Sequence, residues 1–183
     1  MSMDFKKCVK ERRSVRRFKA DRVPDEVLES IVTSASYSPS WKNTQTTRYI
    51  MVENAELKDG LAQTCMMDFD HNRDIVISAP AAIIVTSITG RAGHERDGTF
   101  TTSLGQHWES FDAGVATQTL CLSAHAEGLG AVILGVFDAD KTGKLAGVPD
   151  GQKVAAIVAI GYPDEAPAMP KRKTAAELLD YRR

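Results

Sequence analysis

The sequence predicts a β-sheet packed by α-helices, and two observations lead to this fold class. Short apolar runs, rich in β-branched residues, recur at 81–86, 131–134 and 154–160, as expected of buried strands. Segments in which apolar residues follow helical spacing stand between these runs, so helices and strands interleave along the chain. With 183 residues and no internal repeat, the chain is expected to form one domain, residues 1–183, with a proper core.

The stretch from Trp108 to Gly135 organises the chain. A helix is predicted to about Glu127, Gly128 and Gly130 sit where a left-handed C-terminal cap belongs, and 131–134 reads as a strand. Two apolar rows follow the helical spacing: Trp108, Phe111, Val115, Leu122 and Ala126, and then Ala113, Ala116, Leu120 and Ala124. Two rows leave little polar face, so the helix is expected to be buried on most sides, by the chain or by a second copy.

The remaining elements follow in order. Helices are predicted at 5–13, from Pro24 to about 35, at 57–67, in a short piece ending at Ser78, and at 138–148, and a final amphipathic segment follows Lys173. Strands are predicted at 48–52, 81–86, 131–134 and 154–160. Residues 38–43 have the composition of a loop. Residues 90–105 mix Gly, Thr and charge without periodicity, which predicts a mobile loop.

Composition excludes several classes of protein. The net charge of -1, with 26% charged residues, offers no general attraction to nucleic acid or to an anionic membrane. Three widely spaced cysteines favour reduced thiols over disulfides or a zinc site. The start of the chain lacks the apolar core of a signal peptide, and no apolar run has the length of a membrane span. A cytoplasmic protein is therefore expected.

Two basic clusters are the first candidates for chemistry. Arg12, Arg13, Arg16 and Arg17 form one of them, and Lys171, Arg172 and Lys173 form the other. The first cluster is compatible with a solvated helix end, with nucleic-acid binding, which the balanced surrounding charge disfavours, or with a phosphate site. Guanidinium groups match phosphate geometry, and Ser14 adds a hydroxyl donor.

Other common sites are not indicated. Gly128-Leu-Gly130 follows a helix and precedes a strand, the reverse of the order in a dinucleotide-binding fingerprint. The four histidines show no metal-ligand spacing, and no nucleophile motif or pair of carboxylates stands out. If the protein is an enzyme, a cofactor is expected to carry the chemistry.

Four stretches together resemble the nitroreductase family of flavin mononucleotide (FMN) enzymes. Arg12-Arg-Ser-Val-Arg-Arg-Phe18 resembles the opening motif of the family, and Ser38-Pro-Ser-Trp-Lys-Asn-Thr-Gln45 resembles its Pro-Ser-x-x-Asn-x-Gln loop. Ala126-Glu-Gly-Leu-Gly130 resembles the Gly-Leu-Gly after its long helix, and Pro170-Lys-Arg-Lys173 resembles its C-terminal basic motif. Each motif is weak alone, but their shared order along nearly the whole chain is specific.

The resemblance implies an α+β fold and a homodimer with two FMN sites at the subunit interface. By position, Arg12, Arg13, Ser14 and Arg16 would hold the phosphate and ribityl side, with Arg16 reaching towards the ring, and Lys171, Arg172 and Lys173 would complete the phosphate site. Pro39, Ser40, Asn43 and Gln45 would line the ring from the partner subunit, and Leu134 and Gly135 would offer backbone groups near flavin N5.

The sequence departs from the family pattern at several places. Thr46-Thr47-Arg48 replaces the usual Pro-Trp after Gln45, and Trp41 and Lys42 occupy positions that are often small, which makes Trp41 the candidate substrate contact. The ring-contacting Asn and Lys of some members have no clear counterpart around His71-Asn-Arg-Asp74, and a substrate lid would have to come from 90–105.

The resemblance implies an oxidoreductase that takes a hydride from NAD(P)H at flavin N5 and passes it to nitroaromatics, quinones or similar acceptors by a ping-pong mechanism. A flavin store or redox sensor without turnover is the alternative. An anion-binding interaction module is a third possibility, and it would be colourless when purified.

Overall fold

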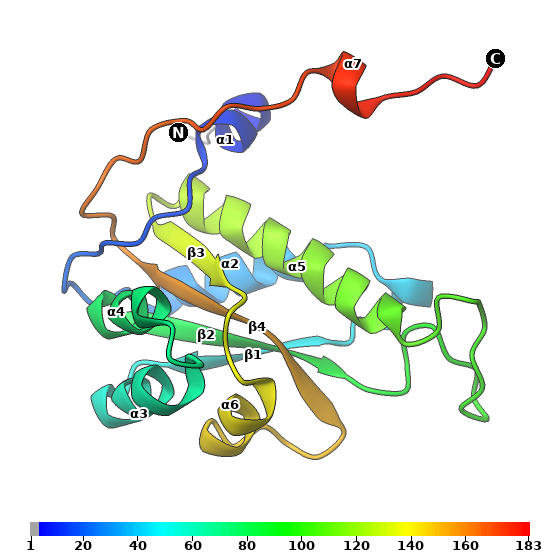
Figure 1. Cartoon of the computed structure of the whole chain (residues 1–183), viewed down its shortest axis with the longest axis horizontal. Helices are drawn as coiled ribbons and strands as arrows, with labels where there is room; N and C mark the ends of the chain where they lie inside the picture. The colour runs from blue at the N-terminus through cyan, green and yellow to red at the C-terminus, as the bar shows by residue number, and fades with distance from the viewer. Residues whose placement is uncertain (1–3) are drawn as a thin grey trace.

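The computed structural model describes residues 4–183 and contains an antiparallel four-stranded sheet with helices on both faces (Figure 1). Across the sheet the strands are β1 (Thr47–Val52), β2 (Ala81–Ile88), β4 (Gln152–Gly161) and β3 (Gly130–Leu134). Residues 1–3, which belong to the stretch expected to lack a signal peptide, lie outside the described part. The predicted α+β class, a sheet flanked by helices, is confirmed.

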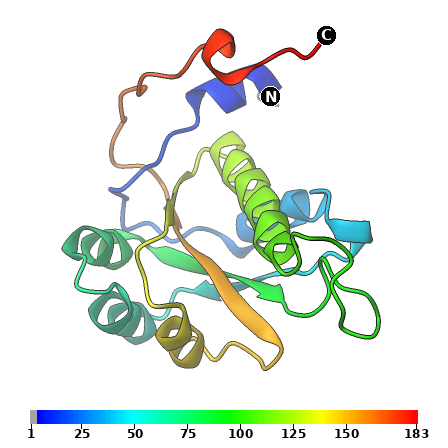
Figure 2. The same ribbon diagram turned by 45° about the vertical axis from the view of Figure 1, so that its right-hand side comes forward.

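Two cores lie on the two faces of the sheet. Helices α3 (Ala55–Cys65), α4 (Asp70–Ser78) and α6 (Ala139–Leu145) cover one face, and α2 (Asp25–Ser36) and α5 (His107–Ala126) cover the other (Figures 1 and 2). Successive side chains of β2 alternate between the two cores, since strand side chains point to opposite faces. Burial on both faces explains why this strand is apolar along most of its length.

Helix α5 is buried along one side only. The row Ala113, Ala116, Leu120 and Ala124 packs towards the sheet. The other predicted row stays accessible in the single chain, and the side chain of Phe111 is 60% exposed. Within residues 4–183 the chain covers this second row only in part, since Trp41 packs against Trp108 and Cys8 contacts the Leu122 carbonyl. Of the two covers that were expected, the second copy stays a prediction.

The glycines after α5 have different roles. Gly128 has φ +80° and ends the helix, as predicted for a left-handed cap. Gly130 is already the first residue of β3, so its predicted role in the cap is wrong. It is required for packing instead, since a Cβ there would lie 2.7 Å from Cβ of Val15. This close approach lets residues 14–15 lie against the start of β3.

The remaining elements are short. Helix α1 (Phe5–Glu11) precedes the basic stretch, the 3-10 turn η1 (Trp41–Asn43) lies in the 38–45 loop, and α7 (Ala175–Leu178) stands near the end of a tail that leaves the sheet on the side of α1 (Figures 1 and 2). Helix α3 starts two residues before its predicted start because Asn54 caps it. Among residues 4–183, no helix is both long and apolar enough to span a bilayer.

Candidate functional site

The basic stretch 12–18 lies along the edge of the sheet. Ser14 forms a parallel bridge with Ala131 of β3, and the Val15 amide donates to the Ala131 carbonyl at 3.1 Å. Cys8 of α1 contacts the Leu122 carbonyl in the last turns of α5 at 3.4 Å. The predicted phosphate-binding residues therefore stand at the C-terminal end of α5, beside β3.

The arginines of this stretch are held in different ways. Arg12 and Arg13 are half-buried, and Arg13 Nη1 donates to the carbonyls of Lys10 at 2.6 Å and Arg12 at 2.8 Å. Arg13 Nε is buried and has no hydrogen-bond partner. Arg16 is exposed, with Nη1 3.2 Å from the Ser14 carbonyl. The stretch presents several cationic donors with capacity for an anionic ligand.

The C-terminal tail meets the basic stretch through residues that the sequence analysis did not select. A Glu165 carboxylate oxygen accepts from the amides of Arg16 at 2.5 Å and Arg17 at 3.3 Å. Within residues 4–183, no hydrogen bond or ion pair joins the predicted Lys171, Arg172 and Lys173 to the arginines at 12, 13 and 16, and Arg172 bonds only to neighbouring carbonyls. All three are exposed.

The 38–45 loop runs along α5 towards its N-terminal end: Ser38 Oγ donates to Thr119 Oγ1 at 2.7 Å, and Trp41 lies farther on, at Asp112. Lys42, Asn43 and Gln45 have positive φ angles of 43°, 54° and 48°. The loop is held by bonds from the Gln45 amide to Ser40 Oγ at 3.0 Å, and from Gln45 Nε2 to Asn43 Oδ1 at 3.1 Å. The predicted residues Pro39, Ser40 and Gln45 also line a cavity of about 770 Å³ between α2, β1 and α5.

Aromatic side chains gather where this loop meets α5. The rings of Trp41 and Trp108 lie 4.8 Å apart, and Phe111 lies 5.3 Å from Trp108. The Trp41 amide donates to the buried Asp112 carboxylate at 2.9 Å, while Trp41 Nε1 is buried without a partner. Burial raises the pKa of Asp112, and the amide bond partly offsets this. Trp41 was a predicted site residue, but no motif marks Trp108 and Asp112, the two α5 residues that contact it.

Loop 90–105 is anchored at its base by a buried carboxylate. Glu109, on the first turn of α5, accepts from the Gly90 amide at 2.7 Å and pairs with Lys153 Nζ of β4 at 2.5 Å. His94 Nδ1 lies 3.9 Å from the same carboxylate. Farther out, Glu95 pairs with Lys42 at 3.4 Å. The loop predicted to be mobile thus has fixed contacts with both α5 and the 38–45 loop.

The turn after β3 contains the last predicted residues. Leu134 is buried, Gly135 is exposed, and the next carbonyl, that of Val136, accepts from Asn72 Nδ2 at 3.0 Å. Asn72 is itself buried on α4. No motif marks Asn72 in the sequence. The one available signal was its spacing of three and four residues from the apolar Ile75 and Val76, which places all three on one face of the helix.

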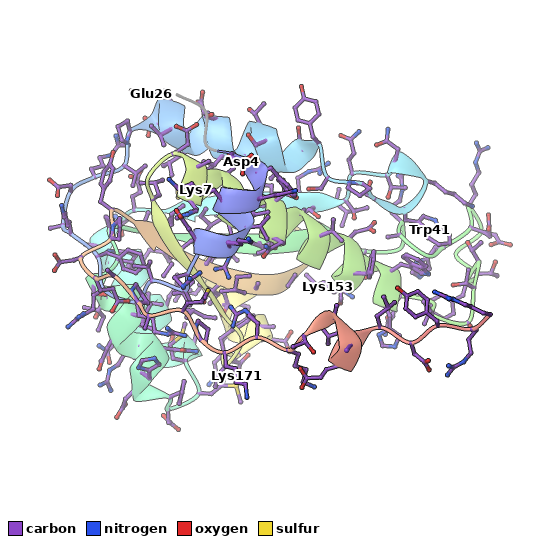
Figure 3. The ribbon with its side chains drawn as sticks, turned by 90° about the horizontal axis from the view of Figure 1, so that it is seen from above. Asp4, Lys7, Glu26, Trp41, Lys153 and Lys171 are labelled. Atoms are coloured by element: carbon purple, nitrogen blue, oxygen red, sulfur yellow. The ribbon has the colours of Figure 1, made fainter. Side chains whose placement is uncertain are left out.

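The candidate residues therefore form two groups, which we call the basic half-site (residues 12–16 with 134–135) and the loop half-site (residues 39–45 with Trp108 and Asp112). The loop half-site is attached to α5 at Asp112, and α1, which leads into the basic half-site, is attached at Leu122. The helix axis rises by about 15 Å between these two residues. Figure 3 shows Trp41 near one end of α5 and Lys7 of α1 near the other. One chain separates the two halves of the predicted site.

Comparison with known proteins agrees with the motifs and the fold. The model of the nitroreductase family matches residues 9–74 and 68–162. The chain belongs to the nitroreductase family. It is 26% identical to an NADH dehydrogenase of Thermus thermophilus (89% of this chain, 88% of the relative) and 29% identical to an NADPH-flavin oxidoreductase of Vibrio harveyi (87% and 66%). The predicted family is confirmed.

The fold agrees with that of other nitroreductase-family members. A solved structure from Exiguobacterium sibiricum, which is a complex with FMN, superposes with a TM-score of 0.85 at 21% identity, covering 100% of this chain and 99% of that one. At this identity the likeness establishes the shared fold.

Proposed function

We propose that this chain is an FMN-dependent oxidoreductase that uses NAD(P)H to reduce a small electron-poor acceptor, such as a nitroaromatic compound or a quinone, and that it works as a homodimer. Membership of the nitroreductase family makes it an oxidoreductase and supports FMN as the cofactor. Its three cysteines, all buried and unpaired, agree with the reducing conditions of the cytoplasm.

The distribution of unsatisfied polar atoms supports this proposal most directly. Within residues 4–183, the buried side-chain atoms without a hydrogen-bond partner are Arg13 Nε, Trp41 Nε1, Thr44 Oγ1 and His125 Nε2. Two belong to the loop half-site and Arg13 belongs to the basic half-site. His125 lies near Arg12 and Arg13: burial lowers its pKa most, and the charges of the two arginines lower it further. Since buried polar groups are normally paired, both half-sites are suited to a ligand with many polar atoms.

FMN fits this set of donors. Its phosphate would be held by Arg12, Arg13 and Ser14, with Arg16 on the ribityl side, because guanidinium and hydroxyl groups donate to phosphate oxygens. Lys171, Arg172 and Lys173, exposed on the extended tail, would complete the phosphate site. The backbone at Leu134 and Gly135 would face the ring, in a turn that Asn72 holds in place.

A second copy of the chain would bring the two half-sites together. Pro39, Ser40, Asn43 and Gln45 lie at the other end of α5 from the arginines, so they would reach the ring from the partner subunit. The exposed row on α5 that includes Phe111 supplies an apolar surface for this contact. Bound there, FMN would supply the redox chemistry by accepting a hydride from NAD(P)H and passing it to the acceptor.

The residues of the chain would bind and orient the two substrates. Trp41, supported by Trp108, offers an aromatic face on which a flat acceptor can stack. Nicotinamide and acceptor would occupy the same space in turn, which gives ping-pong kinetics. Lys42 and Glu95, paired across the edge of this space, link the 38–45 loop to loop 90–105 and would limit the size of the acceptor.

One anaerobic titration tests the proposal. The purified protein should be yellow, with the absorbance of an oxidised flavin, and NADH or NADPH should bleach it within the mixing time. Addition of a nitroaromatic compound or a quinone should then restore the colour. A colourless protein that does not take up FMN would contradict the cofactor assignment. A yellow protein that NAD(P)H does not bleach would instead indicate the flavin store or sensor.

A further inference from the structure

Glu165 occupies an unusual position for an acidic residue, directly against the basic stretch. One carboxylate oxygen accepts from two successive amides, those of Arg16 and Arg17, and the other lies 3.4 Å from Arg17 Nε. The Glu165 side chain is 17% exposed, while Arg17 is 74% exposed. These donors hold the pKa of Glu165 below its usual range, so it is ionised at neutral pH.

The backbone around this contact explains its importance. On one side, residues 14–15 bond to Ala131 of β3. On the other side, the Lys19 amide donates to the Tyr162 carbonyl and the Asp164 amide donates to the Arg17 carbonyl, both at 2.9 Å. Between these two attachments the amides of Arg16 and Arg17 have Glu165 as their acceptor. The contact spans 149 positions of the sequence and fixes the part of the basic stretch that has no strand partner.

The carboxylate has two opposing effects on an anion bound nearby. Its charge repels the anion, and its hydrogen bonds keep the arginine backbone in one conformation. The charge effect is reduced because Glu165 is paired with Arg17 and because surface charges are screened by solvent. The positional effect is not screened, since releasing two amides would free the backbone between Val15 and Phe18.

We infer that Glu165 is a positioning residue for the phosphate group of the flavin: it fixes the backbone of the basic stretch at Arg16 and Arg17 and holds the Arg17 side chain, leaving Arg12, Arg13 and Ser14 to donate to the phosphate. The inference rests on the proposed function, because it requires that the basic half-site binds the FMN phosphate. The effect of Glu165 should be larger on the phosphate than on the ribityl chain and the ring, which FMN and riboflavin share.

Comparison of FMN with riboflavin isolates this effect, because the two differ only in the phosphate. Both affinities are measured by fluorescence quenching on the full chain freed of flavin. Glu165→Ala should weaken FMN binding by about tenfold, as expected for loss of a charge-assisted hydrogen bond, while riboflavin affinity changes less than about twofold. Glu165→Gln keeps an oxygen acceptor for the amides and should retain most of the preference for FMN.

Asp164→Ala is the matched control. Asp164 is exposed and carries the same charge one residue away, but only its backbone amide contacts the basic stretch, and the substitution keeps that bond. FMN affinity should therefore stay at the wild-type value. Tighter FMN binding in both Glu165→Ala and Glu165→Gln would overturn the inference and leave a simple charge effect. Equal weakening of FMN and riboflavin would overturn it in favour of a general structural role.

Two further results complete the test. If Glu165→Ala does not fold, Glu165→Asp takes its place, because its shorter side chain keeps the charge and loses the reach to the amides. The same selective loss for FMN is expected, and an unchanged FMN preference would overturn the inference. If the wild-type protein binds FMN no more tightly than riboflavin, the proposed phosphate site is itself wrong, and the role of Glu165 falls with it.

Discussion

At the scale of single residues, charge and hydrogen bonding at the two ends of α5 are the features with most consequence. The half-buried Arg12 is the first residue of the basic half-site, and within residues 4–183 no ion pair holds its side chain, which can therefore donate to a phosphate group. We expect Arg12→Ala to weaken FMN binding by about 1.5–3 kcal/mol, or roughly ten- to a hundred-fold. Equilibrium titration with FMN measures this, with the exposed Arg96 changed to Ala as a control. Unchanged affinity in Arg12→Ala would contradict the placement of the phosphate.

Trp41 has a different expected effect, because it lies in the loop half-site. Trp41→Ala removes the ring that packs at a tilt against Trp108 while leaving the arginines untouched. The ratio of kcat/KM for a nitroaromatic compound to that for a quinone should change by about two- to tenfold, in line with aromatic pair energies. FMN retention, measured by absorbance after gel filtration, should stay close to wild type. An unchanged acceptor ratio would show that acceptors do not stack on Trp41.

His125 provides a pH-dependent prediction. Burial and the charges of Arg12 and Arg13 lower its pKa from the ordinary value of 6.5, although Glu11 acts in the opposite direction. The folded state therefore prefers neutral His125, while the unfolded chain takes up a proton as the pH falls below 6.5. The free energy of unfolding should therefore decrease as the pH falls below 6.5, and it should decrease less in His125→Gln than in the wild type. Thermal melting of the flavin-free protein between neutral and mildly acidic pH compares the two; identical pH dependence would contradict the prediction.

At the scale of elements, the base of loop 90–105 depends on one buried carboxylate. Glu109 of α5 is 2% exposed, and its carboxylate accepts from the amide of Gly90, just after β2, and from Lys153 of β4. This one carboxylate therefore links α5 to both segments. Glu109→Ala leaves the Gly90 amide without its acceptor and should cost about 2–3 kcal/mol of unfolding free energy. Glu109→Gln keeps an acceptor for that amide and should cost less.

Hydrogen exchange can localise the effect of Glu109→Ala. Amides of residues 90–105 should exchange faster in this variant, while those of β3, on the far edge of the sheet, should be unchanged. Uniform acceleration across the protein would show that Glu109 supports the whole fold and has no special relation to the loop. The same variant should also lose the order that the Lys42–Glu95 pair brings to the edge of the loop half-site.

At the scale of the whole molecule, the exposed row of α5 is the feature that requires a partner. We expect a dimer at low micromolar concentration in sedimentation experiments, with folding and dimerisation inseparable. Phe111→Glu places a charge on this row and should abolish the dimer, and with it the fold and FMN binding. Phe69→Glu, at an exposed phenylalanine next to α4, is the matched control and should remain dimeric. A wild-type monomer that retains FMN would contradict the assembly of the site from two copies.

The sequence alone was sufficient for the family, for most helices and strands, and for the motifs of the candidate site. These features are local: apolar periodicity marks the strands β2 and β4, and a turn glycine such as Gly128 marks the end of α5. Periodicity identifies an amphipathic surface but does not say what covers it. The sequence therefore shows that the second row of α5 is apolar, but it does not show that this row stays exposed in the single chain.

The tertiary structure decided how the motifs are arranged in space. It separated the arginines from Trp41 and the loop residues beside it along α5, and it brought Asn72 to the turn after β3 and Glu165 to Arg16. Asn72 and Glu165 belong to no motif, because each acts through a contact with a residue far away in the chain. Such contacts arise when the sheet and its helices pack, and the local pattern of the sequence carries no signal for them.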